Sequence, residues 1–324
     1  MRRSARSSSR PFDLLVIGDI NPDVIVRAPD PRPAFGQTER WVDSIDLVVG
    51  SSSAITACGA SRLGLSTAIG GLVGDDPLGR FMLAELASRG VDVSCVQARP
   101  ELVTGASVIL SAPADRAILT APGAIPLLRA RDVPASILGR ARHVHVGSVF
   151  LLDALRPDLP GLLASAREAG ATTSVDTNWD PHDDWDGGLA AVLAETDVFL
   201  PNREEATRIT GLDDPADAAR SLVAAGPSVV AVKLGPQGAL AATARGTLHR
   251  VSALPTEVCD TTGAGDAFDA AFIAGWIWRW SVPRTLALAS ACGSLSTRGI
   301  GGVAGQPTLA EAQAAVDTLR HGPP

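Results

Sequence analysis

The sequence predicts an α/β protein built around a mainly parallel β-sheet. Short runs rich in apolar and β-branched residues alternate with longer segments that carry apolar residues at helical spacing. This alternation is typical of strand–helix units that assemble into a parallel sheet. Several of the short runs are almost continuously apolar, as expected for strands that helices cover on both faces. Two further segments lack helical spacing and predict a small β-lobe beside the main sheet.

The expected strands of the main sheet are spread along the whole chain. They span residues 14–18, 67–74, 143–148, 172–176, 197–202 and 229–235. The segments between them are long enough for helices, and the clearest of these is 78–90. It carries apolar residues at helical spacing and closes with Gly90, a residue type that commonly terminates a helix.

The two segments without helical spacing are 22–49, with extended runs around a proline-rich turn, and 102–120, which predicts two strands joined at Pro113-Ala114-Asp115. Such hairpin-like insertions indicate a small β-sheet lid. Residues 1–11, with arginines among serines, are expected to form a disordered basic tail. The chain is therefore divided into this tail, an α/β core at 12–21, 50–101 and 121–320, and a β-lid at 22–49 and 102–120.

The composition of the 324-residue chain excludes several classes of partner. A net charge of -7 gives no basic patch for nucleic acid. No stretch approaches the run of about 18 apolar residues that a membrane helix needs. The four cysteines lie far apart and form no CxxC pair, which is typical of reduced thiols in a cytoplasmic protein. We expect a cytoplasmic protein with neither nucleic acid nor membrane as a partner. Lys233 is its only lysine.

Polar residues follow several expected strands at the point where each strand ends. They are Asp19, Asn21 and Asp23, then Asp176 and Asn178, then Asn202 and Glu205, and finally Lys233, Gly235 and Gly238. Any one of them is an ordinary turn residue. In an open parallel sheet, however, ligands bind beyond the carboxyl ends of the strands, where all these residues would meet. Their convergence predicts a binding site.

The most specific motif is DTTGAGDAF, residues 260–268, in which small residues open an apolar helix. A helix N-terminus presents unpaired N–H groups and a positive dipole, so the motif predicts a phosphate-binding site. Asp266 lies in the first turn, where an acid ordinarily caps the helix. Beside a bound phosphate a carboxylate is unfavourable unless it takes part in the chemistry, for example by accepting a proton from an attacking hydroxyl. We interpret Asp266 as a general base.

Other phosphate-binding motifs do not fit this sequence. A Walker A loop needs GxxxxGK[ST], and the only lysine lacks that context. GAGDAF lacks the third glycine of the dinucleotide fingerprint and does not follow the first strand. The HRD and DFG motifs of protein kinases are missing as well.

Taken together, the motifs resemble those of the ribokinase-like, or PfkB, carbohydrate kinases. The resemblance extends from about Phe12 to about Ala314. It also includes GDINPD (18–23), GLVGDDPLG (71–79), NREE (202–205), which matches the family's NxxE, and KLGPQG (233–238). It implies a ribokinase-like three-layer αβα sandwich with a mainly parallel central sheet and a small β-sheet lid. It also implies Mg²⁺-dependent transfer of the γ-phosphoryl group of ATP to a hydroxyl of a small sugar or sugar acid.

The resemblance assigns roles to the reacting and sugar-binding groups. Asp266 matches the general base, and the backbone of Gly263, Ala264 and Gly265 matches the anion hole. The residues expected to bind the sugar are Asn21, Asp23, Gly50, Ser51 and Asn178. The family's glycine motif GGxxxNxA is GSSSAITA here, so Ser51 replaces a glycine and Ile55 replaces an asparagine that bonds a sugar hydroxyl. This departure predicts a hydroxyl pattern different from that of ribose.

The resemblance also assigns the residues expected to bind ATP and metal ions. Asn202 and Glu205 match the residues that organise Mg²⁺ and phosphate, Glu205 through water, and Gly235 and Gly238 match the turn beside the nucleotide. Asp260 and the backbone of Thr262 match a monovalent-cation site, for K⁺, that some members have. Lys233 follows a strand beside the nucleotide turn, and two interpretations stay open. Its side chain either extends to solvent or neutralises ATP phosphates.

Two alternatives to a sugar kinase remain. One is a nucleoside kinase of the same fold, and the other is a sugar-binding regulator without catalysis. The intact Asp266 and the intact glycine segment before it argue against the regulator. An exposed β-lid also predicts a homodimer that pairs through the lid. Arg116, next to the expected lid turn, is either a surface residue or a contact for an anionic substrate.

Overall fold

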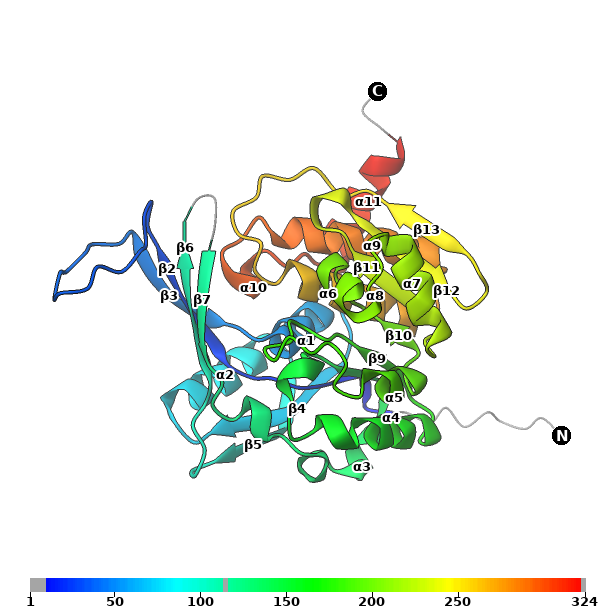
Figure 1. Cartoon of the computed structure of the whole chain (residues 1–324), viewed down its shortest axis with the longest axis horizontal. Coiled ribbons are helices and arrows are strands. Elements are labelled where there is room, and N and C mark those ends of the chain that lie inside the picture. Colours follow the sequence, from blue (N-terminus) through cyan, green and yellow to red (C-terminus); the bar gives the residue numbers. More distant parts are fainter. Residues whose placement is uncertain (1–9, 113–115, 322–324) are drawn as a thin grey trace.

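The computed structural model describes residues 10–112 and 116–321, which form two β-sheets of unequal size (Figure 1). Within these residues the larger sheet has nine strands in the order β13-β12-β11-β10-β9-β8-β1-β4-β5. The pairs β11–β12 and β12–β13 are antiparallel, and all other neighbours are parallel. The predicted mainly parallel sheet is confirmed. Residues 1–9 of the expected tail and the expected turn at 113–115 lie outside the described residues.

The strands of the larger sheet are β1 (Phe12–Ile17), β4 (Thr67–Gly74), β5 (Asp92–Arg99), β8 (Ala141–Val146), β9 (Thr172–Val175), β10 (Val198–Phe199), β11 (Val229–Lys233), β12 (Ala239–Thr243) and β13 (Leu248–Val251). The strand expected at 197–202 is shorter than predicted, because Asn202 already caps the next helix. The strand expected at 229–235 ends at Lys233, because Gly235 has a φ of 56° and begins a turn. The predictions missed β5, β12 and β13.

The helices are α1 (Ser52–Arg62), α2 (Pro77–Ser88), α3 (Ala135–Leu138), α4 (Leu159–Glu168), α5 (Leu189–Ala194), α6 (Arg203–Thr210), α7 (Pro215–Ala224), α8 (Ala264–Ile277), α9 (Val282–Ser296), α10 (Gly301–Ala304) and α11 (Leu309–His321). Short 3₁₀ turns are η1 (Ile125–Leu127), η2 (Ala130–Asp132), η3 (Val149–Leu151), η4 (Arg156–Asp158) and η5 (Gly235–Gln237). The helix predicted at 78–90 is α2. The side chain of Asp76 caps its N-terminus, and Gly90, with a φ of 79°, follows its end. None of the described helices combines the length and apolar character required to span a membrane.

The sheet separates two hydrophobic cores, one on each face, which makes the main body a three-layer sandwich. In β1, Leu15 and Ile17 belong to one core, together with residues of α4, α5 and α7. Leu14 and Val16 belong to the other core, which contains residues of α1, α2, α8 and α9. A strand buried on both faces needs apolar side chains at successive positions. The near-continuous apolar runs of the sequence therefore predicted this layering correctly.

The smaller sheet is the lid, and its strands stand to one side of the sandwich (Figure 1). It has the order β3-β2-β6-β7, with β2 (Pro22–Arg27), β3 (Ser44–Val49), β6 (Ala106–Ser111) and β7 (Arg116–Ala121). Strands β2 and β6 are parallel, and the two outer pairs are antiparallel. The small β-lobe is confirmed, while the exact residue limits of core and lid stay a prediction.

Candidate active site

The polar residues predicted to converge do meet where the carboxyl ends of β1, β9, β10 and β11 face the N-terminus of α8. Lys233, the last residue of β11, contacts Asp176 after β9 and Asp269 on α8. Its backbone also forms an isolated β-bridge with Asn202, which follows β10. On the β1 side, the backbone N–H of Ser53 donates to Asp19 Oδ1 at 3.1 Å. Parallel strand polarity thus gathers these segments at one edge of the sheet.

Asp266 lies in the first turn of α8, half-buried, and faces the start of α1. Its Oδ1 accepts a hydrogen bond from Ser52 Oγ, and its backbone carbonyl accepts one from Thr56 Oγ1 at 3.4 Å. Burial raises the pKa of Asp266 to about 7, and the nearby Asp176 and Asp19 add to this, whereas Ser52 and Lys233 oppose it. A carboxyl group with such a pKa can accept and return a proton near neutral pH.

The glycines before Asp266 shape the helix terminus. Gly263 is the N-cap, with a φ of 75°, and a Cβ there would lie 2.5 Å from Gly302 Cα. Gly263 is therefore required both by its conformation and by close backbone packing. A Cβ on Gly265 would instead lie 3.6 Å from Lys233 Nζ, an ordinary contact. The first turn of α8 is thus closed against α10 and presents N–H groups without intrahelical acceptors on its other side.

The residues predicted to bind the sugar form a group next to Asp266. The backbone N–H of Asn21 donates to Ser51 Oγ at 2.7 Å, and Ser51 Oγ donates to Asn21 Oδ1 at 2.5 Å. Ser51 adopts a φ of 67°, which is uncommon for a residue with a side chain. A Cβ on Gly50 would collide with the carboxyl group of Asp23. Burial and then Asp19 raise the pKa of Asp23 to about 7.

Asn178 and Ile55 are less directly joined to this group. Asn178 Nδ2 donates to Ser148 Oγ at 3.1 Å, and its backbone N–H donates to Asp176 Oδ1 at 2.7 Å. Asn178 therefore lies on the β9 side of the sheet edge. The side chain of Ile55 is buried, and a Cβ on Gly302 would collide with it. At Ile55 the chain replaces a polar family residue with packing against α10.

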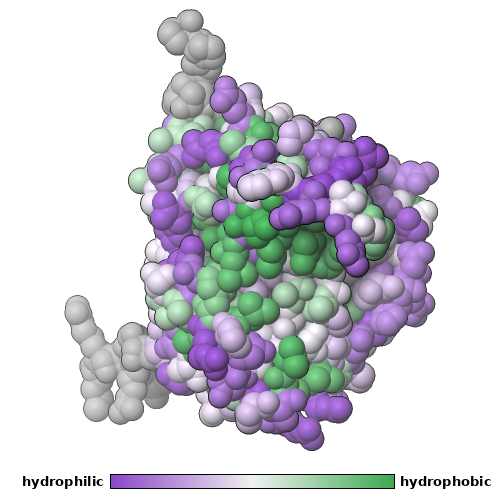
Figure 2. Space-filling model, turned by 90° about the vertical axis from the view of Figure 1, so that its left-hand side faces the viewer, coloured by the Kyte–Doolittle hydropathy of each residue, from purple (hydrophilic) through white to green (hydrophobic). Residues whose placement is uncertain are grey.

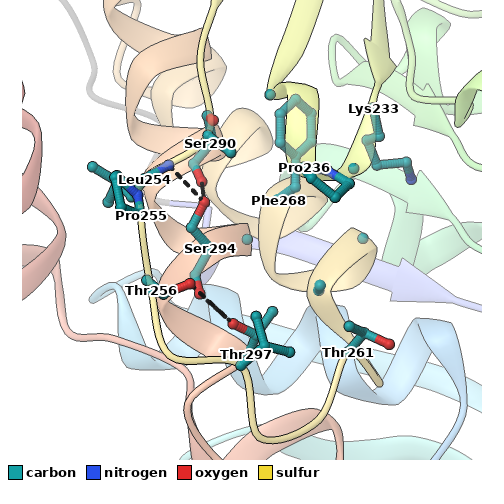
Figure 3. A pocket seen from close by; sticks show the side chains of 17 residues that line it. Lys233, Pro236, Leu254, Pro255, Thr256, Thr261, Phe268, Ser290, Ser294 and Thr297 are labelled. Carbon is teal, nitrogen blue, oxygen red and sulfur yellow. Dashed lines mark hydrogen bonds between the residues drawn. The ribbon is translucent and has the colours of Figure 1, made fainter. Parts of the chain in front are cut away.

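A cavity of about 480 Å³ opens beside the first turn of α8 (Figure 3). Of the predicted residues, it is lined by Lys233, Gly235, Gly238, Ala264 and Gly265. Its volume falls within the range of small-molecule sites. The predicted nucleotide turn and the predicted anion hole therefore border the same space.

The opposite wall of this cavity was missed by the sequence predictions. It consists of the loop 253–258, of Ser290, Gly293 and Ser294 on one face of α9, and of Thr297 directly after this helix. The backbone N–H of Leu254 donates to Ser294 Oγ at 3.0 Å, and this bond holds the loop against α9 (Figure 3). The spacing of the four small residues at 290, 293, 294 and 297 is helical and was the available signal.

Asn202 and Glu205 form a reciprocal cap on α6. Asn202 Oδ1 accepts from the N–H of Glu205 at 2.9 Å, and Glu205 Oε2 accepts from the N–H of Asn202 at 2.8 Å. Burial and then Asp176 raise the pKa of Glu205 to about 7, although Lys233 lowers it. The reciprocal hydrogen bonds therefore fix the motif and keep the Glu205 carboxyl group beside the charged strand ends.

Asp260 is held by donors from three sides. Its Oδ1 accepts from the N–H of Thr262 at 2.9 Å, and its Oδ2 accepts from the N–H of Gly301 at 2.8 Å. Arg116 of the lid places Nη1 3.8 Å from Asp260 Oδ1 and 2.9 Å from Thr262 Oγ1. Arg116 thus joins the lid to the loop before α8. A monovalent cation at Asp260 and Thr262 stays a prediction.

Lys233 does not extend into solvent, so that interpretation was wrong. Its side chain is 13% exposed, and Nζ lies 2.5 Å from Asp176 Oδ2 and 3.0 Å from Asp269 Oδ2. Burial disfavours the charged amine, but the two carboxyl groups outweigh this effect and raise its pKa. Sequence reasoning missed Ser52 and Asp269, which contact Asp266 and Lys233 respectively. Ser52 belongs to the serine run after Gly50, which was the signal available.

Comparison with known proteins agrees with this geometry. The profile of the pfkB family carbohydrate kinases matches residues 12–309. A fructokinase from Klebsiella pneumoniae is 33% identical over 275 residues, which cover 80% of this chain and 88% of the fructokinase. An ATP-dependent ribose-1-phosphate kinase from Halopiger xanaduensis is 33% identical over 297 residues, covering 91% and 95% of the two chains. A solved E. coli structure, assigned as ribokinase II in complex with ATP and Mg²⁺, has a TM-score of 0.83 at 26% identity and covers 94% and 99%. The ribokinase-like fold is confirmed.

Proposed function

Because this chain belongs to the pfkB family of carbohydrate kinases, which are phosphotransferases acting on hydroxyl groups, we propose that it transfers the γ-phosphoryl group of ATP to a hydroxyl of a small sugar or sugar acid. The observation that supports this proposal most is the position of Asp266. A carboxyl group with a pKa of about 7 lies in the first turn of a helix whose N–H groups border a cavity of nucleotide size. ATP is proposed because a relative is named ATP-dependent and the E. coli structure is an ATP complex.

In the proposed reaction a sugar hydroxyl oxygen attacks the γ-phosphorus of ATP. Asp266 accepts the hydroxyl proton, the new oxygen–phosphorus bond forms, and the bond from the γ-phosphorus to the β,γ-bridging oxygen breaks to release ADP. The N–H groups of Gly263, Ala264 and Gly265 stabilise negative charge on the transferring group. Asn21, Asp23, Gly50, Ser51 and Asn178 are proposed to bind and orient the sugar. Lid closure over the site excludes water, which would otherwise hydrolyse ATP.

Mg²⁺ would be held by Glu205 through water and by ATP phosphates, with Asn202 orienting the carboxyl group. Mg²⁺ is commonly held by one or two carboxylates together with substrate phosphates and water. Both Glu205 oxygens already accept hydrogen bonds from Asn202, an arrangement that favours contact through water. When bound, the ion would neutralise phosphate charge. Among the described residues, no group of three or more His, Cys, Asp or Glu is placed to hold a metal.

The proposed function is tested by a substrate panel. ATP consumption is measured with Mg²⁺ and with fructose, ribose 1-phosphate, other sugars, sugar acids and nucleosides in turn. We expect turnover with a sugar or a sugar acid. Preferred turnover of a nucleoside would replace the proposed acceptor class. Tight sugar binding without turnover of any compound would instead indicate a non-catalytic regulator.

The reaction should lose its rate in acid with a midpoint near pH 7. Asp266 must be deprotonated to accept the hydroxyl proton, and its raised pKa of about 7 means that the active form is depleted as the pH falls through that value. At saturating MgATP, kcat/KM for the sugar should fall by at least about tenfold per pH unit well below this midpoint. A flat profile between pH 5.5 and 8 would contradict the assignment.

We also propose that two copies of the chain pair through their lids. The strand register places only apolar residues in the middle of the outward face of the lid: Leu47, Val24, Val108 and Leu119 in one row, and Ile45, Val26, Leu110 and Ala117 in the next. Figure 2 views the molecule from the lid side and shows hydrophobic residues gathered on this face. Exposed apolar patches of this kind on a sheet favour association.

Acidic substitutions on the outward face of the lid should dissociate the proposed dimer. Ile45 and Leu119 are 65% and 63% exposed, and replacement of both by Glu would put four like-charged groups into an isologous interface. Sedimentation analysis should give a dimer for the wild type and a monomer for I45E/L119E. Leu212→Glu, at a 39% exposed leucine between α6 and α7, is the matched control and should leave the dimer intact. A wild-type monomer, or a double variant that stays dimeric, would exclude this interface.

A further inference from the structure

The only lysine of the chain is the centre of a buried charged cluster behind the proposed general base. Lys233 Nζ donates to Asp176 Oδ2 at 2.5 Å and to both carboxyl oxygens of Asp269, at 3.1 and 3.0 Å. The side chains of Asp176 and Asp269 are only 5% and 0% exposed. We call Lys233, Asp176 and Asp269 the lysine cluster. Its members come from the ends of β11 and β9 and from the second turn of α8.

The pKa values of the two carboxyl groups of the cluster are shifted in opposite directions. Burial is the largest influence on Asp176 and opposes its ionisation, but the Lys233 charge and the hydrogen bonds to Asp176 together outweigh burial and lower its pKa. Burial also dominates at Asp269, where it raises the pKa well above the usual value despite Lys233. Two neighbouring carboxyl groups in a buried site do not both ionise readily. The Lys233 ammonium therefore favours the ionised form of Asp176, whereas burial favours the protonated form of Asp269.

The cluster is directly connected to the reacting groups. Asp269 follows Asp266 by three residues on α8, so one turn of helix joins the buried anchor to the proposed base. Gly265 presents its Cα to Lys233, since a Cβ there would lie 3.6 Å from Nζ. A rigid tie between Lys233 and Asp269 therefore holds the first turn of α8 at a set distance from the strand ends.

From these contacts we infer that Lys233 is a positioning residue, which anchors the first turn of α8 through Asp269 and supplies the positive charge behind Asp266. This inference rests on the proposed kinase function. It differs from the expectation that Lys233 neutralises ATP phosphates, because both carboxyl partners already accept hydrogen bonds from its amine. Contact with ATP would require the amine to leave partners that are buried, and an uncompensated buried charge is strongly unfavourable.

Several charged or polar groups surround Asp266 and set its response to the loss of Lys233. They are Ser52 of α1, Asp19 after β1, Asp176 after β9, Glu205 of α6, Lys233 of β11 and Asp269 of α8. Lys233 is the only cation among them. Its removal leaves Asp266 among acidic neighbours and favours the protonated carboxyl group.

The experiment compares Lys233→Met, Asp176→Asn, Asp269→Asn and the double variant K233M/D176N. We expect K233M to lower kcat at least ~10-fold, to move the acid limb of the pH profile to higher pH, and to change both KM values by less than ~3-fold. Asp269→Asn should lower kcat less than K233M does, because the asparagine side-chain oxygen can still accept a hydrogen bond from Lys233 Nζ. The double variant should lose less than the product of the two single losses, because it removes the cation and the anion together.

Binding and stability provide readouts that do not depend on turnover. Titration calorimetry with MgADP should give K233M and wild type similar affinities, and thermal unfolding should show K233M less stable than K233M/D176N. If K233M raises only the KM for ATP, weakens MgADP binding and leaves the pH profile unchanged, Lys233 contacts the ATP phosphates. This result would overturn the inference. If K233M does not fold, K233M/D176N is compared with Asp176→Asn, and an equal kcat with an equal acid limb for these two variants also overturns the inference. Absence of turnover by the wild type on the whole panel would overturn the proposed function itself.

Discussion

Replacement of Asp266 by asparagine should lower kcat at least ~100-fold while leaving the helix around it in place. Asparagine has nearly the same shape, and its side-chain oxygen can still accept the hydrogen bond from Ser52 Oγ. It cannot take up the proton that the attacking hydroxyl loses. The KM for the sugar should change far less, because Asp23 and Ser51, which are proposed to hold the sugar, are untouched.

The measurement is steady-state kinetics of D266N at saturating MgATP, with thermal unfolding to show that the variant is folded. Ser52→Ala is the matched control, since it removes the hydrogen bond to Asp266 but keeps the carboxyl group. Its loss in kcat should be smaller. Its acid limb should move to higher pH, because the Ser52 hydrogen bond lowers the pKa of Asp266. A near-normal kcat for D266N would exclude Asp266 as the base.

Replacement of Gly263 by alanine should also abolish most activity, with a kcat at least ~100-fold lower, the range seen when an oxyanion donor is lost. The added methyl group would lie 2.5 Å from Gly302 Cα and 2.8 Å from the Gly302 carbonyl oxygen, so the backbone itself must move. The φ of 75° adds a conformational penalty of about 1–2 kcal/mol for a residue with a Cβ. The displaced N–H groups would no longer point at the transferring phosphoryl group.

Gly265→Ala is the matched control for protein stability. It lies two residues away in the same motif, where the added Cβ meets only ordinary contacts with the Lys233 side chain. Chemical denaturation should show a clear loss of stability for G263A and an unchanged or slightly higher stability for G265A. Equal stability of the two variants would mean that Gly263 is not constrained in the way its packing against Gly302 indicates.

Much of the fold could be predicted because parallel strands that are buried on both faces need nearly continuous runs of apolar residues. The apolar runs at 14–18 and 67–74 correspond to β1 and β4. The sequences of β12 and β13 lack a comparable run of strand-forming apolar residues. β12 is the alanine-rich segment ALAAT, which has low intrinsic strand preference, and it becomes a strand by antiparallel pairing with β11. A neighbour supplied by the tertiary structure decided its conformation.

Part of the candidate site could also be predicted from the sequence, and part of it depends on tertiary packing. The residues at the strand ends and the motif at 260–268 could be assembled from the sequence, because strand polarity alone brings carboxyl ends to one edge. The far wall of the cavity could not, since it depends on α9 packing beside α8 and on the loop 253–258 resting against Ser294. The hydrogen bond from Ser52 to Asp266 likewise depends on the packing of α1 next to the first turn of α8.

Lys233 shows which features the sequence determines and which depend on the tertiary structure. By itself, the sequence determined the family, the α/β fold and the fact that a single lysine stands at the end of a strand, and it suggested which segment binds phosphate. Only the tertiary structure decided what that lysine touches. Asp176 and Asp269 lie 57 and 36 residues away along the chain, and no local spacing or propensity links them to Lys233. Their contact exists because the sheet order and the packing of α8 place three distant backbones together, and burial then makes the pairing of their charges obligatory.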